Sequence, residues 1–291
     1  MAGYAKPCGI TKPPRPGTMC PMDLGLRDRA YLVTGGSRGL GFAAAQALVA
    51  EGARVLISAP HEATATAAVA RLERDDQPGA AAWVIADNAD PATPAALIAA
   101  ARDRFGQLDG AVISVGGSPG GTIASITDDQ WQSAFESVFL GAVRLARTLA
   151  ADLGALSGPE AGTVARTGTG GSIVFVLAAS VRAPLPGLAI SNGLFPGLAG
   201  VVKALADEHG PSGVRINGVL PVRIATDRVR QLDALIGDPD EVRARLSQNI
   251  PLRRYGEPAE FGRAAAFLLS PAASYTTGAM IPVDGGAIRS F

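Results

Sequence analysis

Short apolar runs alternate with longer segments of helical periodicity from residue 30 to the C-terminus. Such runs of four to seven residues, followed by turn residues or a polar position, predict β-strands. The run at 172–177 is too apolar to alternate, which is typical of a strand buried on both faces of a parallel sheet. The predicted strands are 30–33, 54–58, 81–86, 110–115, 172–177, 214–220 and 280–283.

Helical patterns fill the stretches between these runs. Thr127 is a plausible N-cap for the longest of them, because its hydroxyl can accept from a free backbone N–H of the first turn. A charge-rich stretch at 227–249 predicts a helical excursion before the last strand. The predicted helices are 42–49, 62–74, 93–105, 128 to about 153, one ending in 204–209, and 260–269.

Alternation without an internal break predicts an α/β fold: one Rossmann-like domain at 26–291 with a doubly wound parallel sheet of about seven strands and helices on both faces. Ligands of such sheets bind beyond the carboxyl ends of the strands. The residues directly after each strand are therefore the candidate site.

The glycine turn Thr34–Gly41 stands between the first predicted strand and its helix. Backbone N–H groups at a helix N-terminus, together with the helix dipole, favour a phosphate. We expect Gly35 to permit the turn, Gly39 to let the backbone approach a pyrophosphate, and Gly41 to let helix and strand pack closely. The strand–turn–helix context indicates a dinucleotide site; the alternative is a glycine-rich turn without a ligand.

Two segments could be mistaken for targeting or membrane elements. Residues 1–25 contain five prolines and no apolar core, which indicates a flexible tail rather than a signal peptide. Residues 183–202 are uncharged and long enough to suggest a membrane span. Their three prolines and four glycines, and the amphipathic segment 203–208 that follows, instead favour a buried loop and a core or interface helix.

Composition narrows the classes of partner. The chain is 47% hydrophobic and 18% charged, so it can bury a sizeable core, and its 26 basic and 26 acidic residues cancel. No basic stripe or polybasic run points to nucleic acid or a membrane surface. Both cysteines precede the first strand and fit neither a disulfide framework nor a metal site, so we expect no metal and a cytoplasmic location.

Several ordered motifs carry a family resemblance. They are the Thr34-Gly-x-x-x-Gly-x-Gly turn, Asp87 after the third strand, and the segments 215–221, 251–258 and 277–286. Over about 24–286 the chain resembles the short-chain dehydrogenase/reductase superfamily, in particular members like the 3-oxoacyl-ACP reductases. The resemblance implies an oxidoreductase with a nicotinamide cofactor and a small-molecule substrate. It assigns cofactor contacts to Gly35, Ser37, Arg38, Gly39, Leu40, Gly41, Asp87, Asn88, Gly116, Pro221 and Thr226.

The cofactor preference depends on the end of the second strand. NAD-preferring relatives place an acidic residue there, on the ribose hydroxyls, whereas this chain has Ala59 and Pro60. Arg38 lies within the glycine turn, where a guanidinium can meet a 2′-phosphate. This favours NADP(H) over NAD(H); the alternative is that Arg38 is a solvated loop charge.

The family's catalytic residues are missing from their expected positions. The family uses an Asn on the long helix, a Ser after the fifth strand, and a Tyr-x-x-x-Lys pair for proton transfer. Aligned on Trp131, on the Pro-Gly at 186–187 and on segment 203–208, these positions hold, in that order, Val138, Ala178, Ser191 and Phe195. No tyrosine lies between Tyr31 and Tyr255, so a small shift in alignment restores nothing.

Other side chains are candidates to fill the gap. Ser180 could orient a substrate oxygen, Arg182 and Arg223 could meet an anionic substrate, and Asn192 could hydrogen-bond a carbonyl; Tyr255 and Tyr275 are the phenols late enough to fold back. Each has an alternative interpretation as a loop, surface or packing residue. Three functions stay open: an oxidoreductase with an atypical site, a non-redox lyase, isomerase or cyclase, and a non-catalytic nucleotide-binding protein.

Assembly is a further expectation. Family members form dimers and tetramers through the long helix, the 191–209 helix and the C-terminal strand. The segment 197–201 carries small and apolar residues on more of its surface than one core face needs. We therefore expect a homo-oligomer, a dimer or a tetramer.

Overall fold

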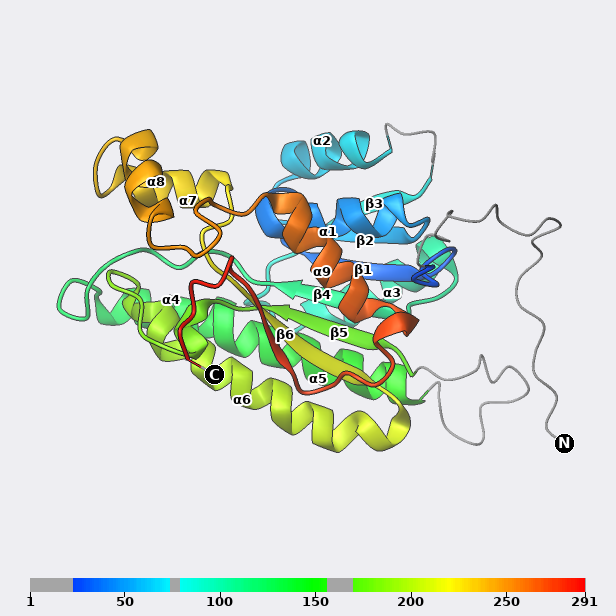
Figure 1. Cartoon of the computed structure of the whole chain (residues 1–291). Helices are drawn as coiled ribbons and strands as arrows, with labels where there is room; N and C mark the ends of the chain where they lie inside the picture. The colour runs from blue at the N-terminus through cyan, green and yellow to red at the C-terminus, as the bar shows by residue number, and fades with distance from the viewer. Residues whose placement is uncertain (1–22, 74–78, 156–169, 291) are drawn as a thin grey trace, which may run out of the picture.

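The computed structural model describes residues 23–73, 79–155 and 170–290. Its strands form one parallel sheet in the order β3-β2-β1-β4-β5-β6-β7 (Figure 1). The sheet confirms the predicted fold class and strand positions. The strands are β1 (Ala30–Thr34), β2 (Arg54–Ala59), β3 (Ala81–Ile85), β4 (Gly110–Ser114), β5 (Ser172–Val176), β6 (Arg215–Pro221) and β7 (Met280–Val283).

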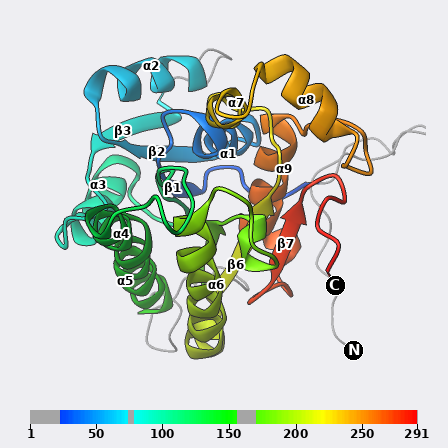
Figure 2. The ribbon, with the colours of Figure 1, turned by 90° about the vertical axis from the view of Figure 1, so that its left-hand side faces the viewer.

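Helices cover both faces of the sheet (Figure 2). One face packs on α1 (Gly39–Ala50) and α9 (Pro258–Leu269), with α2 (Glu62–Leu72) beside β2 and β3. The other packs on α3 (Thr93–Phe105), α5 (Gly141–Ala155) and α6 (Ala189–His209). Because each β5 residue is buried, that strand contributes to both apolar cores, as its uninterrupted apolar sequence predicts.

The single long helix predicted from residue 128 is corrected by the structure. It consists of α4 (Asp128–Ala134), a π-helical turn at Phe135–Leu140, and α5. Thr127 caps α4 as predicted, and the Gln130 side-chain oxygen accepts from the Thr127 N–H, which completes a capping box. A π-turn is also helical, and a short pattern of apolar and polar residues does not distinguish its i→i+5 hydrogen bonds from those of an α-helix.

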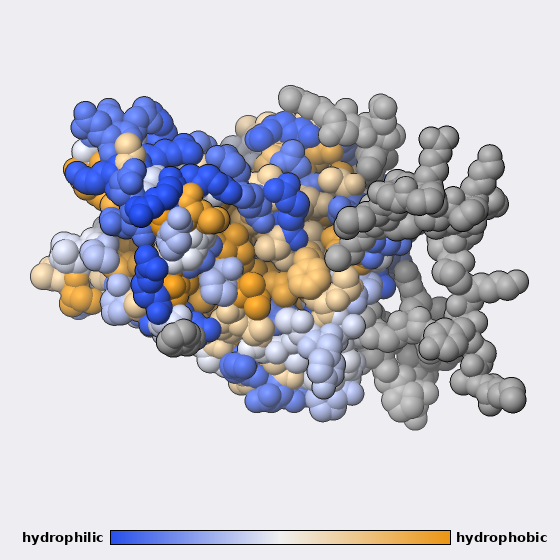
Figure 3. All heavy atoms as spheres, in the orientation of Figure 1, coloured by the Kyte–Doolittle hydropathy of each residue, from blue (hydrophilic) through white to orange (hydrophobic). Residues whose placement is uncertain are grey.

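The predicted excursion at 227–249 resolves into α7 (Asp227–Ala234) and α8 (Pro239–Ser247). Figure 3 shows predominantly hydrophilic residues over α8, as expected from its charged sequence. The predicted tail at 1–25 lies outside the described residues except for its last three, of which Leu24 packs against the core.

Among the described residues, one helical segment, Ala189–Ser212, is long and apolar enough to cross a membrane by length and composition. It contains α6, whose Leu198, Val202 and Leu205 are buried in the core under the sheet. Gly193 and Gly197 let Trp131 and Phe139 approach its backbone, since a Cβ atom at either glycine would lie 2.8 Å from the ring. Packing within the fold therefore uses much of its apolar surface.

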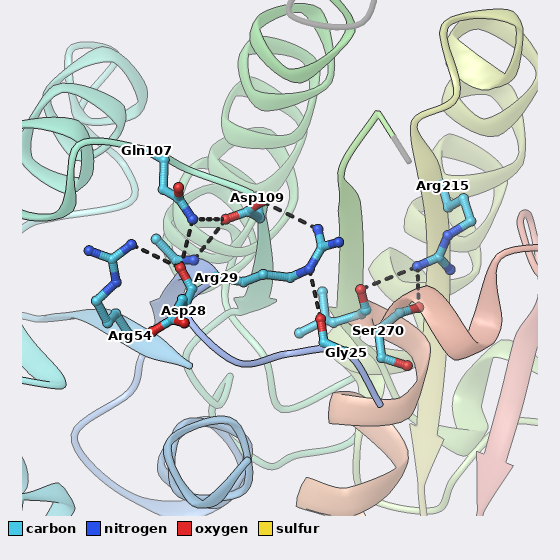
Figure 4. A network of polar contacts seen from close by, with 10 residues as sticks. Gly25, Asp28, Arg29, Arg54, Gln107, Asp109, Arg215 and Ser270 are labelled. Carbon is cyan, nitrogen blue, oxygen red and sulfur yellow. Dashed lines mark hydrogen bonds and ion pairs between the residues drawn. The ribbon is translucent and has the colours of Figure 1, made fainter. Parts of the chain in front are cut away.

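Polar contacts fix the amino ends of the strands, opposite the expected site (Figure 4). The Arg29 guanidinium donates to the Asp109 carboxylate at 3.3 Å, which joins the start of β1 to the start of β4. Arg215 is buried and donates to the carbonyl oxygens of Leu268, Leu269, Ser270 and Thr276 at the end of α9. Burial lowers the pKa of Arg215 to about 10, so it stays charged at neutral pH.

Candidate functional site

A cavity of about 510 Å³, the site cavity, lies beyond the carboxyl ends of β1 to β4. The chain leaves β1 for β2 on one side and reaches β4 on the other, so the cavity lies at the topological switch point of the sheet. It is lined by Gly35, Ser58, Ala59, Pro60, Ala86, Asp87, Asn88, Ser114, Gly116, Gly117, Ser118, Pro119, Asp129, Gln130, Ser133, Ala134, Ser137 and Val138.

The glycine turn has a backbone that side chains would disturb. Gly35 and Gly39 have φ of +58° and +59°, a region that favours glycine. A Cβ atom at Gly41 would lie 2.4 Å from the Gly35 carbonyl oxygen, so the absence of a side chain there lets α1 start against the turn. A Cβ atom at Gly39 would meet nothing within 4 Å, which leaves this backbone open to a ligand.

Four of the predicted cofactor residues line the site cavity: Gly35, Asp87, Asn88 and Gly116. Gly141 lets α5 pack directly on Asn88, because a Cβ atom there would lie 2.4 Å from the Asn88 carbonyl oxygen. The remaining turn residues lie outside the lining, with Arg38 exposed at the position preceding α1. These turn residues are Ser37, Arg38, Gly39, Leu40 and Gly41.

Pro221 and Thr226 also lie outside the lining, at and beyond the end of β6. The Thr226 hydroxyl accepts from the Val229 N–H at 3.4 Å and so caps α7. A hydroxyl that accepts one hydrogen bond keeps its own hydrogen to donate. Thr226 therefore holds α7 while retaining a donor.

Of the four substituted tetrad positions, only Val138 lines the site cavity. Val138, which lines the site cavity, belongs to a buried apolar cluster with Ile190 and Leu194, and Phe195 packs against the same cluster. Ser180 and Ser191 are joined because the Ser180 hydroxyl donates to the Ser191 carbonyl oxygen at 3.2 Å. Ala178 is half-buried two residues after the end of β5. Val138 and Phe195 thus share one apolar cluster, whereas Ser191 is tied to Ser180.

No tyrosine or lysine lines the site cavity among the residues that the structure describes. Tyr31 is buried within β1. Tyr255 is buried and donates to the Asp233 carboxylate at 3.0 Å, while Tyr275 is fully exposed after α9. Beyond residue 12 the sequence has one lysine, Lys203, whose Nζ lies near Gly278 by β7. Neither late tyrosine folds back to the cavity, so none of the three described tyrosines places a phenol there for proton transfer.

The polar candidates have partners within the fold. The Asn192 amide, in the first turn of α6, accepts from the Leu185 N–H at 2.8 Å and donates to the Leu185 carbonyl at 2.9 Å, so it fastens the loop that precedes the helix. Arg223 pairs with Asp233 at 2.5 Å. Arg182 is exposed at the end of the short 3-10 turn Ala179–Val181. None of the three lines the site cavity.

Sequence reasoning missed one wall of the site cavity. Asp129, Ser133 and Ser137 on α4 and the π-turn line it, and their spacing of four residues places them on one helix face. This spacing of polar residues was the signal in the sequence that could have revealed the wall. Ser118 was also missed; it is buried, and its hydroxyl has no hydrogen-bond partner among the described residues.

Comparison with known proteins shows where this architecture recurs. A family model described as Enoyl-(Acyl carrier protein) reductase matches residues 35–287. L-Rhamnose 1-dehydrogenase (NAD(P)(+)) of Azotobacter vinelandii is 34% identical over 267 residues, covering 90% of this chain and 97% of that protein. The 3-oxoacyl-[acyl-carrier-protein] reductase of Salmonella typhimurium is 32% identical over 256 residues, with coverages of 88% and 95%.

Among solved structures, L-sorbose reductase from Gluconobacter frateurii, complexed with NADPH and L-sorbose, superposes with a TM-score of 0.81. Its sequence is 27% identical, and the match covers 93% of this chain and all of that chain. The family model, the two enzymes above 30% identity and the shared sheet agree. The chain belongs to the short-chain dehydrogenase/reductase family of oxidoreductases.

Proposed function

We propose that this chain binds a nicotinamide dinucleotide, with NADP(H) preferred over NAD(H), and acts as an oxidoreductase on a small molecule through an atypical active site. The glycine turn carries this proposal: it has the backbone conformation and the open approach at Gly39 that a pyrophosphate needs. When bound, the dinucleotide supplies or accepts a hydride.

The residues of the turn and of the site cavity fit the two halves of such a cofactor. The turn, from Gly35 to Gly41, would hold the pyrophosphate. Asp87 and Asn88, at the end of β3, would hold the adenine side, and Gly116 would border the path toward the substrate end. L-Sorbose reductase, which shares the fold, was solved with NADPH, and this supports a nicotinamide cofactor here.

The preference for NADP(H) rests on charge. Ser58, Ala59 and Pro60 line the site cavity at the end of β2, so no carboxylate from these three residues repels a 2′-phosphate. Arg38 is exposed on the glycine turn, directly before α1, and supplies a guanidinium suited to phosphate. Arg38→Ala should lower the affinity for NADPH more than that for NADH.

The atypical site follows from the substituted tetrad positions. Positioned acid–base catalysis contributes about 10²–10⁴-fold to a rate. Val138, Ala178 and Phe195 carry no group that transfers a proton, and Ser191 carries only an aliphatic hydroxyl. We infer that hydride transfer here depends on proximity and orientation, with the proton supplied by solvent or by the substrate.

The deciding experiment has two arms. Titration calorimetry with NADP(H) and NAD(H) tests binding, and the absence of heat with both at millimolar ligand would reject the proposal. Turnover with deuterated cofactor across carbonyls, imines and activated alkenes tests redox chemistry. Deuterium in the product supports an oxidoreductase, whereas product without label supports a lyase, isomerase or cyclase.

A second candidate, a non-catalytic nucleotide-binding protein, is favoured by the packing of Val138 and Phe195 on one apolar cluster. Heat in the binding titration together with no turnover of any substrate would select this candidate.

We also propose a homo-oligomer: Gly200 on α6 is exposed, and a Cβ atom there would meet nothing within 4 Å, which leaves room for a second copy. Light scattering that returns a monomer would reject this assembly.

A further inference from the structure

The loop Gly116–Gly120 forms the wall of the site cavity that follows β4, and four of its five residues line the cavity. Three of the five are glycines, and all except Ser118 are exposed. The main-chain bonds at its far end begin only with Gly121, whose N–H donates to the Gly187 carbonyl at 2.7 Å. A glycine-rich segment of this kind has a high conformational entropy to lose, so its order needs a cause.

One contact supplies that cause. The Arg228 guanidinium, from the first turn of α7, donates to the Ser118 carbonyl oxygen at 2.6 Å. No other hydrogen bond within Gly116–Gly120 is found in the part of the chain that the structure describes. Arg228 also lies against Gly117, because a Cβ atom added at Gly117 would lie 3.1 Å from the Arg228 Nε atom. The guanidinium thus rests on two consecutive loop residues.

The support for Arg228 is rigid. Asp233, on the same helix, is buried and accepts from both Arg223 after β6 and Tyr255 before α9. Thr226 caps the helix start, and the Ala225 N–H donates to the Gly256 carbonyl at 2.8 Å. Because α7 is fixed to two separate segments, a contact made from it holds the loop in place.

Ser118 shows that this placement is imposed on the loop. Its hydroxyl is buried without a hydrogen-bond partner among the described residues, an arrangement that a free loop would relax by turning to solvent. The hydrogen bond from Arg228 keeps Ser118 inside.

We propose that Arg228 is a positioning residue that clamps the loop Gly116–Gly120 onto α7 and so forms the substrate-side wall of the site cavity. The effect of the clamp on ligand affinity rests on the proposed function, whereas the clamp itself does not. A ligand that binds only the clamped loop has an apparent affinity reduced in proportion to the clamped fraction.

The clamp is tested in the ligand-free protein by spin labelling. Nitroxide labels are attached through Pro119→Cys on the loop or Gln231→Cys on α7, in a Cys8→Ser, Cys20→Ser background. Arg228→Met should increase the mobility of the loop label and leave the helix label unchanged. Arg228→Lys, which can still donate to a carbonyl, should restore part of the order. Arg230→Met is the matched control, because Arg230 pairs with exposed Asp240 at 3.1 Å.

An unchanged loop label in Arg228→Met, or equal loosening of both labels, would overturn the clamp. The second readout is NADPH affinity without labels. If the clamped fraction falls to about one tenth, affinity falls about tenfold. If the loop becomes mobile and the NADPH affinity does not change, the loop takes no part in ligand binding. Failure of the unmodified protein to bind NADPH would reject the proposed function, while the label comparison would still decide the clamp.

Discussion

The Tyr255 hydroxyl donates to the buried Asp233 carboxylate at 3.0 Å. The Arg223 guanidinium holds the other oxygen of the same carboxylate, and its Cζ lies 5.9 Å from the centre of the Tyr255 ring. Three segments that are distant in sequence are joined in this way: the end of β6, α7, and the turn before α9. A tyrosine considered for proton transfer is instead an anchor for the helix that flanks the site.

Tyr255→Phe should destabilise the fold without altering its backbone. The substitution removes the hydroxyl donor and leaves a buried carboxylate oxygen short of a partner, at a cost of about 1–3 kcal/mol in the free energy of unfolding. Urea denaturation measures this cost. Tyr275→Phe is the control, because Tyr275 is fully exposed and its loss should change stability by less than about 0.5 kcal/mol.

The same pair predicts a dependence on alkaline pH. Burial is the main reason that the pKa of Tyr255 is raised above its ordinary value of 10.0. A raised pKa in the folded state contributes stability that is present below 10.0 and is lost as pH rises through the folded value. The stability difference between the natural protein and Tyr255→Phe should therefore shrink above pH 10.0. A constant difference across that range would contradict the assignment.

Glu260 predicts the opposite behaviour in acid. Arg254 donates to both of its carboxylate oxygens at 2.7 Å, and the Glu257 N–H donates to one of them. These hydrogen bonds, led by those from Arg254, lower the pKa of Glu260 from 4.5 to about 2. The stabilisation is present above 4.5 and is lost as pH falls toward about 2.

Unfolding followed by circular dichroism should show Glu260→Gln less stable than the natural protein above that window and converging with it at the acid end. Glu208→Gln is the matched control, since Glu208 is exposed on α6 and has no ion pair among the described residues. Parallel pH profiles for the natural protein and Glu260→Gln would show that Glu260 does not titrate in this way.

Arg215 should be intolerant of replacement. Its guanidinium satisfies the carbonyl oxygens that α9 leaves unpaired at its C-terminal end, and methionine would strand them in the core. Arg215→Met should lower the free energy of unfolding by about 2–4 kcal/mol. Arg263→Met, an exposed change on the same helix, should stay within about 0.5 kcal/mol. Equal melting temperatures for the two variants would contradict this role.

Substitutions at two glycines of the turn should affect cofactor binding and fold stability differently. Gly39→Ala strains a positive φ by about 1 kcal/mol but meets no neighbour, so its main effect should be a loss of NADPH affinity of about tenfold or more. Gly41→Ala forces α1 away from the Gly35 carbonyl and should lower stability by about 1–3 kcal/mol as well. Calorimetry and thermal unfolding distinguish them; full NADPH affinity in Gly39→Ala would argue against a pyrophosphate at this backbone.

The sequence by itself determined the alternation of strands and helices, the glycine turn and the cap at Thr127. Each depends on residues that are close together in the chain, so the local sequence pattern is enough to predict it. It also placed Asp87 and Asn88 at the cavity, because residues after parallel strands meet at one edge of the sheet. The π-turn at Phe135–Leu140 was missed, since six residues are too few for a sequence pattern to separate π-helical from α-helical bonding.

Only the tertiary structure decided which polar groups are available to a ligand. Asn192 on α6 is engaged by Leu185 of the preceding loop, while Arg223 and Tyr255 contact Asp233, and Arg228 reaches a carbonyl 110 residues away. The packing of the helices on the sheet determines these partners. The sequence alone does not show whether such a side chain is paired or available. Burial makes such pairings obligatory, because an unpaired polar group in the core is costly.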